Sequence, residues 1–319
     1  MNQILKKCPV PIAGLILGLA AAGNLIQSYG QIYHNLFGLI SAVLFIIMLV
    51  KIIKYPKGVA KSLDNPVVAS VFPAFSMAIM LLAAYLKPYM ASAAFIMWII
   101  GLVLHIALII WFTKKFAFNF KIKQVFPSWF IVYVGIVAAS VSGTAFKMTG
   151  IGQIAFWFGF AAYLILLPIV VYRVVKVKQI PEQALPTFCI FAAPAGLLLA
   201  GYMNSFAVKS TALIYFLTVL SLVMYIVVII KLFGLLKLKF YPSYSAFTFP
   251  LVISAIGVKL VNRFLVKSGQ NILALKYLVK FQEVIGIVIT LYVLVRYIQF
   301  LLSKDNAAIN VEKDKSAAR

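Results

Sequence analysis

Apolar residues occur along this chain in long runs that are separated by short polar connections. A membrane-spanning helix needs about 20 predominantly apolar residues. Ten runs of this length, numbered here 1 to 10 in chain order, cover residues 10–28, 32–53, 66–86, 91–113, 126–146, 151–172, 186–206, 211–233, 243–263 and 277–302. The pattern predicts an all-α integral membrane protein with ten transmembrane helices.

The composition supports this prediction. Hydrophobic residues make up 64% of the chain and charged residues 11%, with a mean hydropathy of +1.07. Soluble domains are about half apolar and about a quarter charged. We therefore expect one transmembrane channel or transporter domain over residues 1–303, followed by a polar, disordered cytoplasmic tail over residues 304–319.

The distribution of charge predicts the orientation. The chain has 29 Lys and Arg residues against 6 Asp and Glu, and 21 of these 29 lie at the two ends or in the connections that follow even-numbered runs. Basic connections stay on the cytoplasmic side. We expect a multi-pass protein of the inner (plasma) membrane, with both termini cytoplasmic and five hairpins that close on the outside. Nucleic-acid binding is disfavoured, because the basic residues lie between apolar runs.

A proline repeat distinguishes the odd-numbered runs from the even-numbered ones. An interior proline recurs in every odd run, at intervals of 62, 54, 67 and 56 residues: Pro11, Pro73, Pro127, Pro194 and Pro250. Pro66, Pro186 and Pro242 lie seven or eight residues earlier at the entrances of three of these runs, and Pro168 is the one interior proline of an even run. Gly18, Gly201 and Gly257 follow three of the repeated prolines by seven residues. Prolines are common in membrane helices, but the near-constant spacing disfavours chance. It also disfavours an exporter built from two five-helix halves, which would repeat after about 150 residues. Because Pro11 and Gly18 belong to the repeat, we expect run 1 to be retained rather than cleaved as a signal peptide.

The repeat favours an inner ring of odd helices. A proline within a helix removes a backbone hydrogen bond and kinks the helix, and in lipid the freed groups must face protein or water. We expect the odd helices to face one another around a pore, with the even helices outside them against lipid. Glycines on the proline face would keep the lumen open and allow close packing.

Three motifs in the odd runs resemble a known family. VPIAGL at residues 10–15, FAAPAG at 191–196 with Gly201-Tyr202, and FTFP at 247–250 are similar to segments of the tellurite-resistance/dicarboxylate transporter family, which includes the plant slow anion channels. The resemblance implies five helical hairpins around a central pore and a homotrimer with one pore per subunit. Relatives move tellurite, sulfite, malate and similar dicarboxylates, chloride or nitrate, and the resemblance does not choose among these anions.

Phe249 is the sharpest candidate for a functional residue. The resemblance implies that the phenylalanine before the run-9 proline occludes the pore. A bulky ring at a constriction blocks ions by its size and by excluding water; the alternative is that Phe249 only packs between helices. The residues expected to line the pore are Pro11, Gly18, Phe72, Pro73, Phe126, Pro127, Pro194, Gly201, Pro250 and Gly257.

Charged residues near the outer ends of runs 9 and 10 form a second candidate site. Lys259, Arg263 and Lys267 recur every four residues and so share one helix face. We expect Lys259 and Arg263 to attract anions into an outer vestibule, whereas snorkelling to the interface is the alternative. Glu283 is the acidic residue inside a predicted span, and we expect a neutralising pair with Lys280 rather than a role in proton coupling.

Other chemistry has little support in the sequence. His34 and His105 have no second metal ligand at helical spacing, Cys8 and Cys189 are not expected to form a disulfide, and no cofactor motif occurs. A membrane-embedded enzyme is therefore disfavoured. The sequence predicts an anion channel or transporter, with a proton-coupled carrier of C4 dicarboxylates as the alternative.

Overall fold

The computed structural model describes residues 2–303, and this part of the chain is helical and contains no β-strand. Nine stretches of it are long and apolar enough to cross a membrane. They are Ile12–Tyr29, Gln31–Lys54, Pro66–Leu86, Ala91–Ala117, Thr149–Val177, Glu182–Ser205, Thr211–Leu235, Pro242–Lys267 and Leu273–Leu302. Each overlaps one of the ten predicted runs, so the fold is that of an all-α membrane protein.

Run 5 is the exception, because it does not form one long helix. The chain there is divided into four short pieces: α8 (Trp129–Tyr133), the 3₁₀ helix η4 (Gly135–Val137), α9 (Ala138–Ser142) and the 3₁₀ helix η5 (Gly143–Phe146). Glycine weakens a helix, and two of the pieces begin with one. At Gly135, a Cβ atom would lie 2.7 Å from the Met77 sulfur. The sequence prediction of an unbroken helix here is wrong.

The prolines of the repeat lie where α-helices begin. Pro11 immediately precedes α2 (Ile12–Ile26) and Pro73 precedes α6 (Ala74–Leu86), whereas Pro194 and Pro250 are the second residues of α11 (Ala193–Ser205) and α13 (Phe249–Lys267). Proline suits the first turn of a helix, where its missing N–H is not needed.

Shorter helices lie upstream of three of these prolines. They are α5 (Pro66–Val71) and the 3₁₀ helices η7 (Glu182–Ala192) and η8 (Pro242–Phe247). Runs 3, 7 and 9 are therefore each divided into two helices at or near their proline, which corrects the expectation of continuous, kinked helices for these segments.

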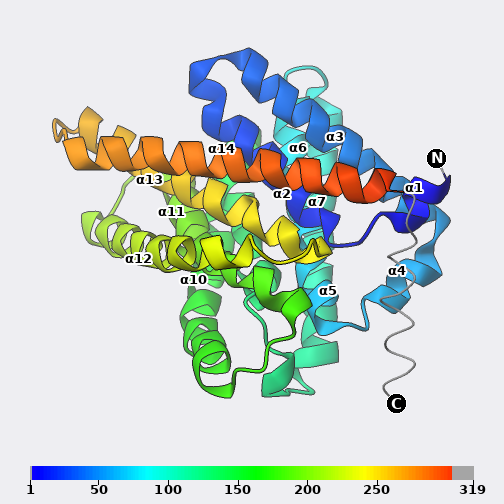
Figure 1. Cartoon of the computed structure of the whole chain (residues 1–319). Coiled ribbons are helices and arrows are strands. Elements are labelled where there is room, and N and C mark those ends of the chain that lie inside the picture. The colour runs from blue at the N-terminus through cyan, green and yellow to red at the C-terminus, as the bar shows by residue number, and fades with distance from the viewer. Residues whose placement is uncertain (1, 304–319) are drawn as a thin grey trace.

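The even segments are long helices that each pack on the odd segment before them. These helices are α3 (Gln31–Lys54), α7 (Ala91–Phe112), α10 (Thr149–Tyr172), α12 (Thr211–Leu235) and α14 (Leu273–Leu302). They contact α2, α6, α9, α11 and α13 in that order, which makes five hairpins. Figure 1 shows the last of these helices, α14, crossing α13 and α2.

The helices of the odd segments form a closed cycle of neighbours. α2 contacts α6 and α13, α9 contacts α6 and α11, and α11 contacts α13. In an apolar stretch of 18 residues within each span, between 61 and 89% of the residues are buried in the four long odd spans, compared with 28 to 39% in the five even spans. The odd segments therefore form the inside of the molecule, and the even helices expose apolar faces on its outside.

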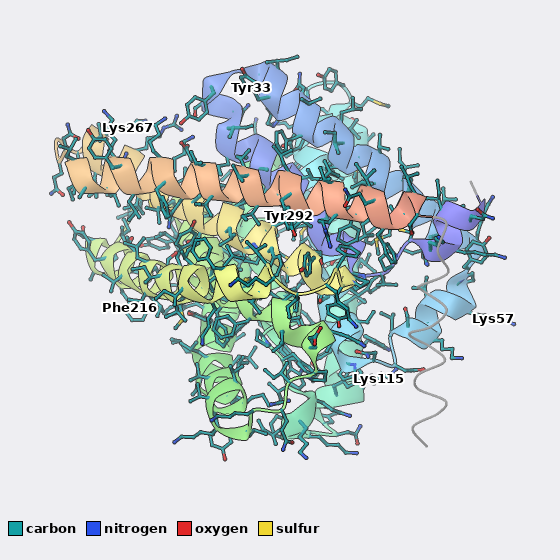
Figure 2. All side chains as sticks on the ribbon, viewed as in Figure 1. Tyr33, Lys57, Lys115, Phe216, Lys267 and Tyr292 are labelled. Atoms are coloured by element: carbon teal, nitrogen blue, oxygen red, sulfur yellow. The ribbon has the colours of Figure 1, made fainter. Side chains whose placement is uncertain are left out.

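Contacts between connections define two faces of the molecule. On the first, the N-terminal face, Lys7 donates a hydrogen bond to the Ser303 carbonyl, and Lys115 lies 2.6 Å from the Asp64 carboxylate. The short helices α1 (Asn2–Lys7) and α4 (Pro56–Ser62) also lie there. Figure 2 shows Lys57 and Lys115 near one end of the molecule and Lys267, which ends α13, near the other, called here the opposite face.

Candidate functional site

All five odd segments contribute to one central cavity. It offers about 30 Å³ to the centre of a water-sized molecule, which is room for about two waters. Its lining residues are Gly14, Leu17, Val71, Ala74, Met77, Phe130, Ile131, Val134, Gly135, Ile190, Ala193, Pro194, Leu197, Ser245, Ala246, Phe249 and Pro250. None of these residues is charged, and Ser245 is the one whose side chain is polar. The cavity is therefore narrow, apolar and enclosed by the cycle of odd segments.

Phe249 lies in the wall of this cavity, at the start of α13. Its side chain is buried, with 6% of its surface exposed. The preceding residue, Thr248, donates from its hydroxyl to the carbonyl oxygens of Ser245, at 2.8 Å, and of Gly14 in α2, at 3.0 Å. The bond to Gly14 attaches the backbone next to Phe249 to the neighbouring helix α2, and the position of the Phe249 ring is thereby fixed.

A close approach of α2 to the start of α13 also holds Phe249 in its position. A Cβ atom at Gly18 would lie 2.3 Å from the Thr248 hydroxyl oxygen and 3.0 Å from the Phe249 backbone nitrogen. Only a glycine fits this distance without displacing the neighbouring helix. Gly14 and Gly18 lie one turn apart on α2, and the segment that carries Phe249 packs against them.

The structure brings three of the predicted pore residues to the central cavity. Pro194, Phe249 and Pro250 line it. The other predicted residues lie outside its lining, namely Pro11, Gly18, Phe72, Pro73, Phe126, Pro127, Gly201 and Gly257.

Two of the predicted glycines outside the lining mark further helix contacts. A Cβ atom at Gly257 would lie 2.7 Å from the Gly196 carbonyl oxygen, and one at Gly201 would lie 2.6 Å from the Val137 side chain. These positions allow α11 to pack closely against α13 and α9.

The pre-proline phenylalanines of runs 3 and 5 have other neighbours. Phe72 stacks on Phe75, with their ring centroids 6.1 Å apart, and the Arg173 guanidinium lies 5.7 Å from the centroid of Phe126. Arg173 also donates to the carbonyls of Lys123 and Lys178.

Sequence reasoning missed much of the lining because it concentrated on prolines and glycines. In run 7, the lining residues Ile190, Ala193, Pro194 and Leu197 follow the i, i+3, i+4, i+7 pattern of one helix face. In run 3 all lining residues stand at other offsets from the proline, and in run 5 only Phe130 shares an offset with run 7. A helical-face analysis anchored at each proline could thus have found part of the lining, but no single offset describes all five segments.

A second cavity lies on the opposite face, between the end of α2 and the C-terminal half of α13. Its volume is about 230 Å³, measured for the centre of a water-sized molecule, and its lining is about half polar and half apolar. The lining residues are Asn24, Leu25, Gln27, Ser28, Ile256, Lys259, Leu260 and Arg263. The structure therefore places Lys259 and Arg263, which the sequence assigned to an outer vestibule, in one cavity.

Glu283 of α14 neutralises part of the charge beside this cavity. Its carboxylate lies 2.6 Å from the Lys259 ammonium and 3.7 Å from that of Lys280, and it accepts a hydrogen bond of 2.5 Å from the Tyr29 hydroxyl. The expected pair with Lys280 is present. The nearer partner, Lys259, was not foreseen, because it depends on how α13 packs against α14.

Both cysteines and His105 are buried in the interior of the protein. Burial raises the pKa of the Cys8 thiol to about 11, although nearby Lys51 opposes this shift, and the thiol therefore stays protonated. Cys189 is also buried. The ring of buried His105 lies 2.8 Å from the Ser76 hydroxyl and 3.1 Å from the Val132 carbonyl. Within residues 2–303, no three His, Cys, Asp or Glu side chains are grouped to hold a metal ion.

The chain is similar to known membrane transport proteins over most of its length. Residues 8–298 match the family model described as voltage-dependent anion channel. An uncharacterized transporter of Methanocaldococcus jannaschii is 25% identical over 265 residues, which cover 74% of this chain and 76% of that protein. The family match includes all five hairpins and both cavities. The chain therefore belongs to the voltage-dependent anion channel family, the tellurite-resistance/dicarboxylate transporter family that its motifs resemble.

Proposed function

We propose that this protein is a channel that conducts small anions through the central cavity. The observation that carries the proposal is that every odd segment contributes to one uncharged cavity inside the cycle of helices. A cavity lined without acidic side chains places no negative charge in the path of an anion, and membership of an anion channel family supports the same function. The anions that we propose are of the tellurite, sulfite, malate-type dicarboxylate, chloride and nitrate class.

In this proposal, Phe249 closes the path. Space for about two water molecules is too little for a hydrated anion, and an apolar constriction of this kind excludes water as well as ions. Moving or trimming the Phe249 ring would widen the cavity without removing any charged group from its lining. The structure would then represent a closed state.

We propose that run 5 crosses the membrane as a tenth, broken segment. Near its start, the Lys123 carbonyl accepts a hydrogen bond from Arg173, which follows α10. At its end, the Ala145 carbonyl accepts one from Lys87, which follows α6. Those partners belong to different faces, so run 5 connects the two. Lys7 and Ser303 share a face, as an even number of crossings requires.

The basic N-terminal face is the cytoplasmic one in this proposal, in an inner (plasma) membrane, because cytoplasmic connections carry an excess of Lys and Arg. A homotrimer with one pathway per subunit is proposed from the family resemblance.

A proton-coupled carrier is the alternative, and Glu283 is the residue that it would use. In the structure Glu283 is paired with Lys259 and lies outside the lining of the central cavity. This placement favours a channel, since a coupling carboxylate would have to exchange protons in step with the anion.

Anion flux into proteoliposomes tests the proposed function. Purified protein is reconstituted, and nitrate, chloride and malate uptake are measured at several imposed voltages, with and without a pH gradient. We expect flux that follows the voltage and does not change with the pH gradient. Uptake that requires the proton gradient would favour the carrier, and uptake equal to that of protein-free vesicles would contradict both functions.

A further inference from the structure

The second cavity presents hydrogen-bond donors beside an excess of positive charge. Lys259 and Arg263 line it, and Lys280 lies on the far side of the Glu283 carboxylate. Together with the Glu283 carboxylate, these three cations form a group of four side chains with a net charge of +2. Such a site favours a negatively charged ligand.

The two cations of the lining have different surroundings. The Lys259 ammonium is bonded to the Glu283 carboxylate at 2.6 Å, the Leu25 carbonyl at 2.7 Å and the Ser28 hydroxyl oxygen at 2.8 Å. All three of its protons are therefore used. Arg263 is exposed and forms no ion pair or hydrogen bond with the part of the chain that the structure describes. Its guanidinium remains available to a ligand.

Neutral side chains in the lining are oriented as donors. Nε2 of His34 lies 3.1 Å from Oδ1 of Asn24, and because an amide oxygen can only accept, Nε2 is the donor of this hydrogen bond. Because the side-chain oxygen of Asn24 accepts this hydrogen bond, the orientation of its amide is fixed and its NH₂ group is available as a donor. The Ser28 hydroxyl oxygen accepts from Lys259, which leaves the Ser28 proton free to donate.

We propose that the second cavity binds a small oxyanion, such as nitrate, sulfite or a carboxylate, with Arg263 as the principal ligand and with Asn24 and Ser28 as additional donors. A guanidinium matches the two oxygens of such an anion with two parallel hydrogen bonds. The proposal rests on the proposed function, because the site would hold an anion before it reaches the central cavity, about 15 Å along α13 from Lys259 to Phe249.

Glu283 has a defined part in this site. By pairing with Lys259 it limits the net positive charge, and it fixes the ammonium that in turn orients Ser28. Conduction requires a site that binds strongly enough to collect the anion and weakly enough to release it. The Lys259–Glu283 pair therefore lowers the affinity of the site enough for a bound anion to be released toward the central cavity.

Ligand-induced thermal stabilisation tests the site without depending on transport. The melting temperature of the purified protein is measured in detergent at increasing nitrate, with chloride replaced at constant ionic strength, for the wild type, Arg263→Gln and Lys267→Gln. Lys267 is the matched control, because it is exposed on α13 and lies outside the cavity lining. We expect nitrate to stabilise the wild type and Lys267→Gln, and we expect Arg263→Gln to need about tenfold more nitrate or more.

External half-saturation of nitrate flux is the second readout. It should rise by a similar factor in Arg263→Gln and stay unchanged in Lys267→Gln. Equal nitrate dependence of the melting temperature in all three proteins would overturn the site, even if all three conduct. Absence of flux from the wild type would instead overturn the proposed function, while an Arg263-dependent stabilisation would still support binding.

Discussion

The space left by a glycine and the hydrogen bond of a threonine, rather than charged groups, determine where the Phe249 ring lies. Gly18 gives Thr248 the space to lie against α2, and the Thr248 hydroxyl then bonds to the Gly14 carbonyl at 3.0 Å. These contacts are direct, and none of them involves a long, flexible side chain that could move aside. A change of one methyl group at Gly18 should therefore be transmitted to Phe249.

Gly18→Ala should destabilise the protein and disturb the position of Phe249. The added Cβ atom would lie 2.3 Å from the Thr248 hydroxyl oxygen, and overpacking of this kind costs about 1–3 kcal/mol. We expect a lower melting temperature in detergent and an altered anion flux. Gly234→Ala is the control, since nothing lies within 4 Å of a Cβ atom there. Equal melting temperatures and fluxes for the two variants would show that the contact is not tight.

Residue roles could be predicted from the sequence only where a pattern was local. The spacing of Pro11 and Gly18 marked α2 as special, and the i, i+3 spacing indicated the Lys280–Glu283 pair. The Lys259–Glu283 pair joins α13 to α14, and Tyr29 reaches the same carboxylate from the end of α2. Those contacts depend on the relative rotation of packed helices, which helical spacing within one segment does not determine.

At the scale of elements, breaks in helices distinguish the odd segments from the even ones. Nine of the ten runs predicted from the sequence coincide with long apolar spans of residues 2–303, and the repeated prolines were correctly located in the odd runs. The sequence did not show that the proline would lie at or near the start of a new α-helix, after the 3₁₀ helices η7 and η8. The difference arises because an isolated proline is compatible with both a kink and a helix start.

Run 5 allows a direct test of the number of crossings. Lys123 and Lys147 flank this segment, and both are exposed. In protein that otherwise lacks cysteine, Lys123→Cys should react with a membrane-impermeant maleimide only from the cytoplasmic side. Lys147→Cys should react only from the outside, because ten crossings place the two ends of run 5 on different sides.

Labelling in intact cells and in inverted membrane vesicles measures this difference. Lys57→Cys in α4 serves as the cytoplasmic reference, since α4 lies on the N-terminal face. Reaction of both test positions from the same side would show that run 5 does not cross, and it would leave nine spans.

At the scale of the whole molecule, five hairpins bring the five odd segments together around one cavity. The cycle of α2, α6, α9, α11 and α13 is closed by the contact between α13 and α2, which joins the last odd segment to the first. The repeat predicted which segments belong inside, and their greater burial agrees with it. The size of the cavity could not be predicted, since it depends on how side chains from five segments fill a common space.

The exposed apolar side chains of the even helices fit the same organisation. Side chains such as Ile32 in α3, Ile230 in α12 and Val284 in α14 are more than half exposed. In water such surfaces would drive association, whereas in a bilayer they contact lipid. The fold therefore separates a lipid-facing layer from an inner layer whose packing sets the width of the central cavity.

The most direct test of anion conduction through the central cavity is the anion flux of Phe249→Ala compared with that of Phe247→Ala. Both rings are buried near the start of α13, but Phe249 lines the cavity, whereas Phe247 packs against Tyr244 with ring centroids 4.8 Å apart. Both variants lose a buried phenylalanine, so the comparison controls for lost packing, which costs about 3–5 kcal/mol in soluble cores. In proteoliposomes with equal amounts of folded protein, we predict a substantially larger voltage-driven nitrate flux for Phe249→Ala and a flux near that of the wild type for Phe247→Ala. Equal fluxes from the wild type and Phe249→Ala would contradict a gate at Phe249 in the central cavity.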